Sequence, residues 1–119
     1  MGLGRTQPGL VTGASGGIGG ETVRQLVAAG ADVIASGRNA KALDKLKAQT
    51  GRRVLPFDLI CKNSVRGALE NLDLWGVVNC GGFGGEIASP IETDLAVFDK
   101  VMAINVRGSL LVIKYARAR

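Results

Sequence analysis

Residues 9–19 read Gly9-Leu10-Val11-Thr12-Gly13-Ala14-Ser15-Gly16-Gly17-Ile18-Gly19, a short apolar run that passes directly into a glycine-rich loop. Such a run predicts a buried strand that ends in a tight turn. After the loop, apolar side chains recur at helical spacing as far as Gly30, which stands where a C-cap glycine belongs. The stretch therefore predicts a strand, a glycine loop and a helix in direct succession.

The same alternation continues along the rest of the chain. The elements expected next are strands at residues 33–35, 54–57 and 74–78, and helices that begin at Asn39 and at Asn63 or Ser64. Pro56 cannot donate a ladder hydrogen bond, so the third strand is expected at a sheet edge. Alternating strands and helices predict an α/β fold with three layers, a Rossmann-like, doubly wound parallel sheet of about four strands in the order 3-2-1-4.

A long helix is expected over residues 94–118, with Thr93 or Asp94 at its start. Its inward side is predicted to consist of Leu95, Phe98, Met102, Asn105 and Val112. Asn105 would then be a polar residue on a buried face. Such a residue either satisfies buried backbone groups or serves a site, and both roles are compatible.

Composition limits the chemistry. The 119 residues suffice for one domain, residues 1–119, and they contain no histidine. Catalysis by Ser-His-Asp or Cys-His is excluded, and no metal site is expected. Cys61 and Cys80 form no CxxC pair, and residues 1–9 have no apolar core, so a reduced, cytoplasmic setting is expected. No apolar run approaches the roughly 20 residues that cross a bilayer, so no membrane association is expected.

The net charge is +5, from 15 lysines and arginines against 10 acidic residues. The basic residues are spread over two segments, residues 41–47 and 107–119, and the chain has one tryptophan and one tyrosine. Because no aromatic stacking platform accompanies them, we expect solvated basic faces and no nucleic-acid partner.

The glycine loop suits an anionic ligand. Backbone N–H groups and the positive end of a helix dipole converge there, and missing side chains let a pyrophosphate approach closely. The spacing of Gly13, Gly17 and Gly19 matches neither a Walker loop nor G-x-G-x-x-G. Residues 13–17 also match the G-x-S-x-G nucleophile elbow, but no histidine is present to take the serine proton. A tight turn without a ligand is the alternative; the strand–helix context favours a dinucleotide.

The residues that meet the adenosine ribose should lie about 20 positions beyond the loop. That stretch is Ser36-Gly37-Arg38, in which Arg38 offers a planar fork of donors for a 2′-phosphate and Gly37 offers no carboxylate to repel one. NADP is therefore favoured over NAD, the alternative being that Arg38 is a solvent-facing charge. A second glycine-dense loop follows Asn79 and should lie beside the first loop, in the crevice where such sheets bind ligands.

These residues resemble the short-chain dehydrogenases/reductases of the classical type. Residues 12–19 look like the T-G-x-x-x-G-x-G cofactor loop, Asp58-Leu59 like the pair whose carboxylate contacts adenine, and residues 78–82 like N-N-A-G with two substitutions. The cofactor-binding residues that the resemblance implies are Gly13, Ser15, Gly16, Gly17, Ile18, Gly19, Gly37, Arg38, Asp58, Leu59, Asn79, Cys80 and Gly81. Cys80 can equally be a small apolar filler beneath the loop. Asn105 resembles the asparagine of the catalytic tetrad, which in relatives helps to hold the water of a proton relay.

The resemblance implies an oxidoreductase that moves hydride between a nicotinamide and a carbonyl or alcohol carbon. The family's catalytic serine, and its catalytic tyrosine with a lysine four residues later, have no matching positions in this sequence. Tyr115 precedes Arg119 by four residues, but it lies on the helix before the one that carries the catalytic tyrosine in the family. We therefore expect a cofactor-binding half, truncated relative to the family, that is inactive alone and meets substrate only if the other half is supplied. The alternative is a non-catalytic dinucleotide-binding or assembly module. Relatives also suggest a homo-oligomer through the helix at 94–118, with Leu110, Leu111 and Ile113 in the contact.

Overall fold

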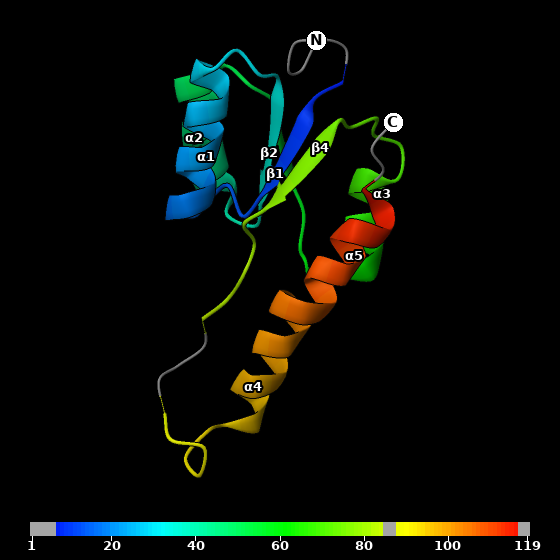
Figure 1. Ribbon diagram of the computed structural model, residues 1–119. Coiled ribbons are helices and arrows are strands. Elements are labelled where there is room, and N and C mark those ends of the chain that lie inside the picture. The colour runs from blue at the N-terminus through cyan, green and yellow to red at the C-terminus, as the bar shows by residue number, and fades with distance from the viewer. Residues whose placement is uncertain (1–6, 85–87, 117–119) are drawn as a thin grey trace.

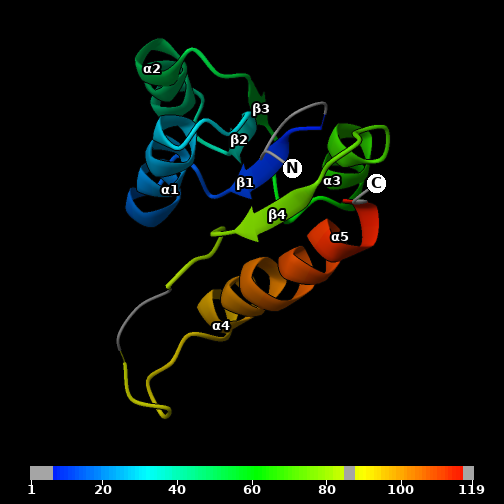
Figure 2. The same cartoon turned by 45° about the horizontal axis from the view of Figure 1, so that its top comes forward.

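The computed structural model describes residues 7–84 and 88–116, which form a four-stranded parallel sheet. Its strands are β1 (Gly9–Thr12), β2 (Val33–Gly37), β3 (Val54–Pro56) and β4 (Gly76–Asn79). The order β3-β2-β1-β4 confirms the predicted order and places Pro56 in an edge strand (Figures 1 and 2). The fourth strand begins at Gly76 rather than at Leu74, because the chain bends at Trp75 between them.

Helices cover both faces of the sheet, so the fold has the three layers predicted (Figures 1 and 2). One face carries α1 (Gly17–Ala28) and α2 (Ala40–Thr50), and the other carries α3 (Lys62–Leu69) and the end of a long C-terminal helix. Side chains alternate between the two cores, because successive residues of a strand point to opposite faces. Leu10 packs in the α3 layer, whereas its neighbour Val11 packs in the α1–α2 layer.

The first helix ends as the sequence predicts. Gly30 has a φ of +91°, and its N–H donates to the carbonyl of Val27 at 3.0 Å. The N–H of Ala31 donates to the carbonyl of Leu26, also at 3.0 Å. These two bonds form a Schellman motif, which turns the chain sharply toward β2.

The starts of α2 and α3 differ in how well the sequence predicts them. The Oδ1 atom of Asn39 accepts a hydrogen bond from the N–H of Ala42 at 3.1 Å, which confirms Asn39 as the N-cap of α2. The prediction that Asn63 or Ser64 caps the next helix is wrong, because α3 begins at Lys62. Ser64 Oγ instead accepts from the N–H of Asp58 at 3.1 Å, so its side chain supports the preceding loop.

The long helix consists of α4 (Leu95–Met102), the π-helical turn η1 (Ala103–Arg107) and α5 (Gly108–Tyr115). Asp94 caps it, since its Oδ1 atom accepts from the N–H of Ala96 at 2.8 Å. The predicted inward stripe is wrong except at Val112: Leu95, Phe98, Met102 and Asn105 are exposed. The buried positions are Ile104, Gly108, Leu111 and Val112.

The position of the helix explains part of this difference. Its first half, α4, extends past the sheet and buries none of its residues, so Leu95, Phe98 and Met102 have no core to face (Figure 1). Leu111 lies in the core and not on the outer surface, where the sequence predicts it to contact another subunit. Within residues 7–84 and 88–116, the helices are all too short or too polar to cross a membrane.

Candidate functional site

A cleft opens at the carboxyl ends of the strands, where the loops that follow all four strands meet. It is lined by Thr12, Gly13, Ser15, Ser36, Gly37, Arg38, Asn39, Phe57, Asp58, Leu59, Gly81, Gly82 and Ile104. Loops after parallel strands share one edge of the sheet, and the order β3-β2-β1-β4 makes β1 and β2 the inner strands of that edge. Four segments that are distant in the sequence and contain predicted site residues therefore converge on one cleft.

The loop after β1 packs directly on the loop after β4. Gly13 has a φ of +64°, and a Cβ atom there would lie 2.5 Å from the backbone carbonyl carbon of Cys80. A Cβ atom on Gly19 would lie 2.1 Å from the carbonyl oxygen of Gly13. Both positions must be glycine for the two loops and the start of α1 to approach each other.

Gly16 and Gly17 have a different environment. A Cβ atom on Gly17 would meet nothing within 4 Å, and one on Gly16 would only touch the carbonyl oxygen of Gly13, at 3.4 Å. Gly16 is the N-cap of α1 and supplies no side chain to the N–H groups of the first turn. Ile18, which follows, is 80% exposed. The start of α1 thus presents open space, backbone donors and the positive end of its dipole, which is the arrangement that accepts a phosphate group.

The loop after β2 contains Gly37 and Arg38. A Cβ atom on Gly37 would lie 2.7 Å from Ser15 Oγ, so any side chain here, a carboxylate included, would have to displace Ser15. Arg38 is exposed at the cleft and, within the described part of the chain, makes no ion pair. Its guanidinium is consequently free to meet an anionic ligand.

The loop after β3 is held by its own hydrogen bonds. Asp58 Oδ1 accepts from the N–H of Ile60 at 3.0 Å, while the N–H of Asp58 donates to Ser64 Oγ. Leu59 fills the space that a side chain at Gly81 would need, since a Cβ atom there would lie 2.5 Å from Leu59 Cδ1. The loops after β3 and β4 are therefore in direct contact.

A chain of hydrogen bonds ties β1, β4 and the long helix together. Thr12 Oγ1 donates to Asn79 Oδ1 and accepts from the N–H of Gly81 at 3.2 Å. Asn79 Nδ2 donates to Ser109 Oγ at 2.9 Å, and Ser109 Oγ donates to the backbone oxygen of Asn105 at 2.8 Å. Sequence reasoning missed Ser109, and no sequence signal points to it, because its role depends on Asn79, 30 residues away.

Asn105 lies in η1 and is exposed, so the expectation of a buried face is wrong for this residue. Its Oδ1 atom accepts from the N–H of Phe83 at 2.7 Å, and its Nδ2 atom donates to the carbonyl of Phe83 at 2.9 Å. Because η1 lies where the helix leaves the sheet, the side chain turns toward the loop after β4 instead of the core. The amide fixes that loop through both of its polar groups.

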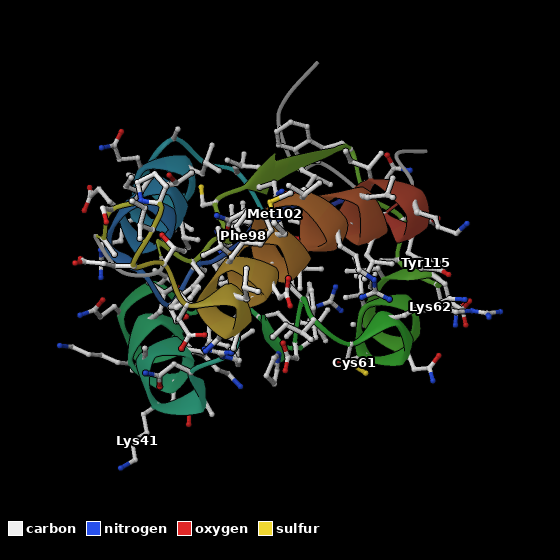
Figure 3. All side chains as sticks on the ribbon, turned by 90° about the horizontal axis from the view of Figure 1, so that it is seen from below. Lys41, Cys61, Lys62, Phe98, Met102 and Tyr115 are labelled. Carbon is white, nitrogen blue, oxygen red and sulfur yellow. The ribbon has the colours of Figure 1, made fainter. Side chains whose placement is uncertain are left out.

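Cys80 is half-buried and packs against the core of the α1–α2 layer, as a small apolar filler does. Cys61 is exposed at the start of α3. Among the described residues, no cluster of histidine, cysteine, aspartate or glutamate could hold a metal ion. Tyr115 packs beside α3 near Arg66 and away from the cleft (Figure 3), and Arg119 lies outside the described residues.

Comparison with known proteins identifies the family. The model of the family described as short chain dehydrogenase matches residues 9–118. The chain belongs to the short-chain dehydrogenase family. These are oxidoreductases that bind NAD(P), and the cleft of this member lies where such a fold binds a dinucleotide.

Individual relatives agree with this assignment. A short-chain type dehydrogenase/reductase from Sinorhizobium fredii is 34% identical over 105 residues, which are 88% of this chain and 42% of the relative. A "Probable NADP-dependent dehydrogenase" from Haemophilus influenzae is 30% identical over 115 residues, 91% of this chain and 46% of that protein. The structure of a short-chain type dehydrogenase/reductase from Mycobacterium ulcerans superposes with a TM-score of 0.89 at 28% identity, over 96% of this chain and 46% of that one. This short-chain dehydrogenase chain spans a little under half the length of these relatives.

Proposed function

We propose that residues 1–119 form a single NADP(H)-binding domain, the cofactor-binding half of a short-chain dehydrogenase/reductase. The observation that carries the proposal is the cleft itself, in which the loops after all four strands meet beside an uncapped start of α1. The space left at Gly17, which no described atom fills, fits a pyrophosphate. When bound, the reduced nicotinamide would donate hydride to a carbonyl carbon, and the oxidised nicotinamide would accept hydride from an alcohol carbon.

Each loop has its own part in holding the dinucleotide. The loop after β1 binds the pyrophosphate through backbone groups of Gly16, Gly17, Ile18 and their neighbours Gly13, Ser15 and Gly19. Gly37 and Arg38 meet the adenosine ribose and its 2′-phosphate, and Asp58 and Leu59 meet the adenine. Asn79, Cys80 and Gly81 line the approach to the nicotinamide. Asn105 holds the loop after β4 through Phe83. As in the family that the chain resembles, it would also help to bind the water of a proton relay.

The preference for NADP rests on the loop after β2. Ser15 Oγ occupies the space that an acidic side chain at position 37 would need, and Arg38 supplies a guanidinium at the cleft that pairs with no carboxylate of residues 7–84 or 88–116. A guanidinium binds a phosphate group with two parallel hydrogen bonds. The name of the Haemophilus influenzae relative, an NADP-dependent dehydrogenase, agrees with this preference.

The decisive variant is Arg38→Asp. It removes the donor to the 2′-phosphate and adds a repelling charge, so NADPH affinity should fall roughly 10- to 100-fold, while NADH affinity stays unchanged or improves. Fluorescence titration with each nucleotide measures both affinities. Lys45→Asp, an exposed residue of α2 outside the cleft, carries the same change of charge and should alter neither affinity by much. Equal losses for NADPH and NADH in Arg38→Asp would refute the 2′-phosphate role.

We propose further that the 119-residue chain binds NADPH but does not turn over alone. The sequence has no match to the family's catalytic serine, tyrosine and lysine, and the chain spans 42–46% of the two relatives' lengths. The chain should show enhanced NADPH fluorescence without oxidation of NADPH by added aldehydes or ketones. Turnover by the chain alone would contradict this proposal and leave NADPH binding intact.

A second role, assembly with a copy of itself or with a longer relative, is favoured by one observation. The outer face of the long helix exposes large apolar side chains, among them Leu110 at 61% and Ile113 at 73%. Apolar faces of this kind commonly form contacts between chains.

A further inference from the structure

Arg107 connects the long helix to a loop of the cleft. It is the last residue of η1, and its Nη1 atom donates to the carbonyl oxygen of Ile60 at 2.8 Å across 47 residues of sequence. Ile60 belongs to the loop between β3 and α3, two residues after Asp58. Among the described residues Arg107 makes no ion pair, so the hydrogen bond to Ile60 is the polar interaction that fixes its side chain.

The peptide groups on either side of Ile60 couple this bond to Asp58. The N–H of Ile60 donates to Asp58 Oδ1 at 3.0 Å, and its carbonyl accepts from Arg107. The helix also packs against the same loop, because a Cβ atom on Gly108 would lie 3.0 Å from Leu59 Cβ. The orientation of the Asp58 carboxylate is thus fixed from the helix side, through a loop that Arg107 holds in place.

The position of this loop in the cleft defines which part of the ligand it meets. In a doubly wound sheet the adenosine ribose binds at the carboxyl end of the second strand. β3 pairs with β2 on the side away from β1, and Phe57, Asp58 and Leu59 line the cleft at its end, where the proposed function puts the adenine. Arg107 does not line the cleft, and its influence on the ligand passes through the loop.

On the basis of the proposed NADP(H) binding, we propose that Arg107 is a positioning residue for the adenine end of the cofactor. It holds the loop after β3 so that Asp58 and Leu59 face the base. The other explanation of an effect at Arg107 is its positive charge, which attracts any phosphate. A ligand that carries phosphates without adenine separates the two explanations.

The test compares adenosine 2′,5′-bisphosphate with inorganic pyrophosphate on the 119-residue chain. Arg107→Met keeps the aliphatic stem and removes the charge and the donors. It should weaken binding of the bisphosphate roughly three- to tenfold, the effect of losing one charge-assisted hydrogen bond, and leave pyrophosphate binding unchanged. Arg107→Lys, which keeps a charge and a donor, should recover part of the loss. Amide hydrogen exchange at Ile60 and Cys61 should become faster in Arg107→Met.

Arg66→Met is the matched control. Arg66 is exposed on α3, pairs with Glu70 at 2.8 Å and is away from the cleft. The hydrogen bond to Glu70 raises the pKa of Arg66, so this variant removes a full positive charge as well. It should leave both ligands bound as in the wild type.

Three outcomes would overturn the inference. Equal weakening of both ligands in Arg107→Met would assign the effect to charge, and unchanged binding of both would show that the loop needs no support from the helix. In either case NADPH binding by the wild-type chain, measured in parallel, would leave the proposed function intact. If the wild-type chain bound neither NADPH nor the bisphosphate, the proposed function and this inference would both be wrong.

Discussion

Gly17 and Gly19 lie two residues apart at the start of α1, and their surroundings differ completely. A Cβ atom on Gly19 would lie 2.1 Å from a backbone oxygen, whereas one on Gly17 would meet nothing within 4 Å. Gly19 is therefore required by the packing of the protein itself. Gly17 leaves open a space that a ligand could fill, and this difference makes the functional role of the loop testable apart from its structural role.

Gly17→Ala should retain the fold and lose the ligand. Alanine in a helix is up to ~1 kcal/mol more favourable than glycine, so the melting temperature should stay or rise slightly. NADPH affinity should fall about tenfold, because the added methyl group occupies the approach of the pyrophosphate. Thermal melts followed by circular dichroism and fluorescence titration measure the two effects.

Two further glycines serve as controls for that experiment. Gly67→Ala, in α3 with open space around it, should give the same gain in stability without any change in NADPH affinity. Gly19→Ala should lower the free energy of unfolding by about 3 kcal/mol or more, since backbone would have to move. If Gly17→Ala bound NADPH as tightly as the wild type does, the open space at the start of α1 would not be the phosphate site.

At the scale of the elements, local patterns predicted local structure well. The strand, loop and helix at residues 9–28, the cap at Asn39 and the edge position of the strand with Pro56 each follow from a few neighbouring residues, and the structure has all of them. The prediction of the inward face of the long helix was wrong because regular periodicity assumes that the helix has a packing partner along its whole length. The projection of α4 beyond the sheet violates this assumption.

Some residues of the candidate site could be predicted from the sequence and others could not. The residues of the glycine loop, Arg38 and Asp58 could be proposed from motifs, because each motif is continuous in the sequence. Ser109 and Arg107 could not, because their partners lie 30 and 47 residues away. Which helix turn faces which loop depends on how the layers pack, and no short stretch of sequence contains that information.

Two helix caps should respond differently to removal. Asn39→Ala and Asp94→Ala each delete a side-chain acceptor at a helix start, a change of about 1 kcal/mol for the helix concerned. α2 buries Leu43 and Leu46, so loss of its cap should lower the global melting temperature. α4 contains no buried residue, so loss of Asp94 should speed amide exchange in its first turn while the melting temperature stays nearly constant. An equal drop in melting temperature for both variants would show that α4 unfolds together with the core.

At the scale of the whole molecule, the most notable surface feature is a set of exposed apolar side chains on the long helix. The long helix exposes an apolar row, defined by Phe98, Met102, Val106, Leu110 and Ile113, with exposed fractions between 42% and 73%. Figure 3 shows Phe98 and Met102 one turn apart on this row. Within the described residues β4 pairs only with β1, and its own residues Val77 and Val78 are partly exposed. An exposed row of large apolar side chains favours association with another chain.

If two copies of this chain associate through the apolar row, Leu110→Lys should separate them. Burying a leucine contributes about 1.5–3 kcal/mol, and a symmetric contact buries two, so the dissociation constant should rise roughly hundredfold or more. Light scattering at micromolar concentration measures the change, and the melting temperature should stay constant because Leu110 is 61% exposed in the single chain. Ile91→Lys, at a residue 97% exposed and outside the row, is the matched control and should leave association unchanged. A monomeric wild-type chain, or equal behaviour of the two variants, would exclude the apolar row as the contact.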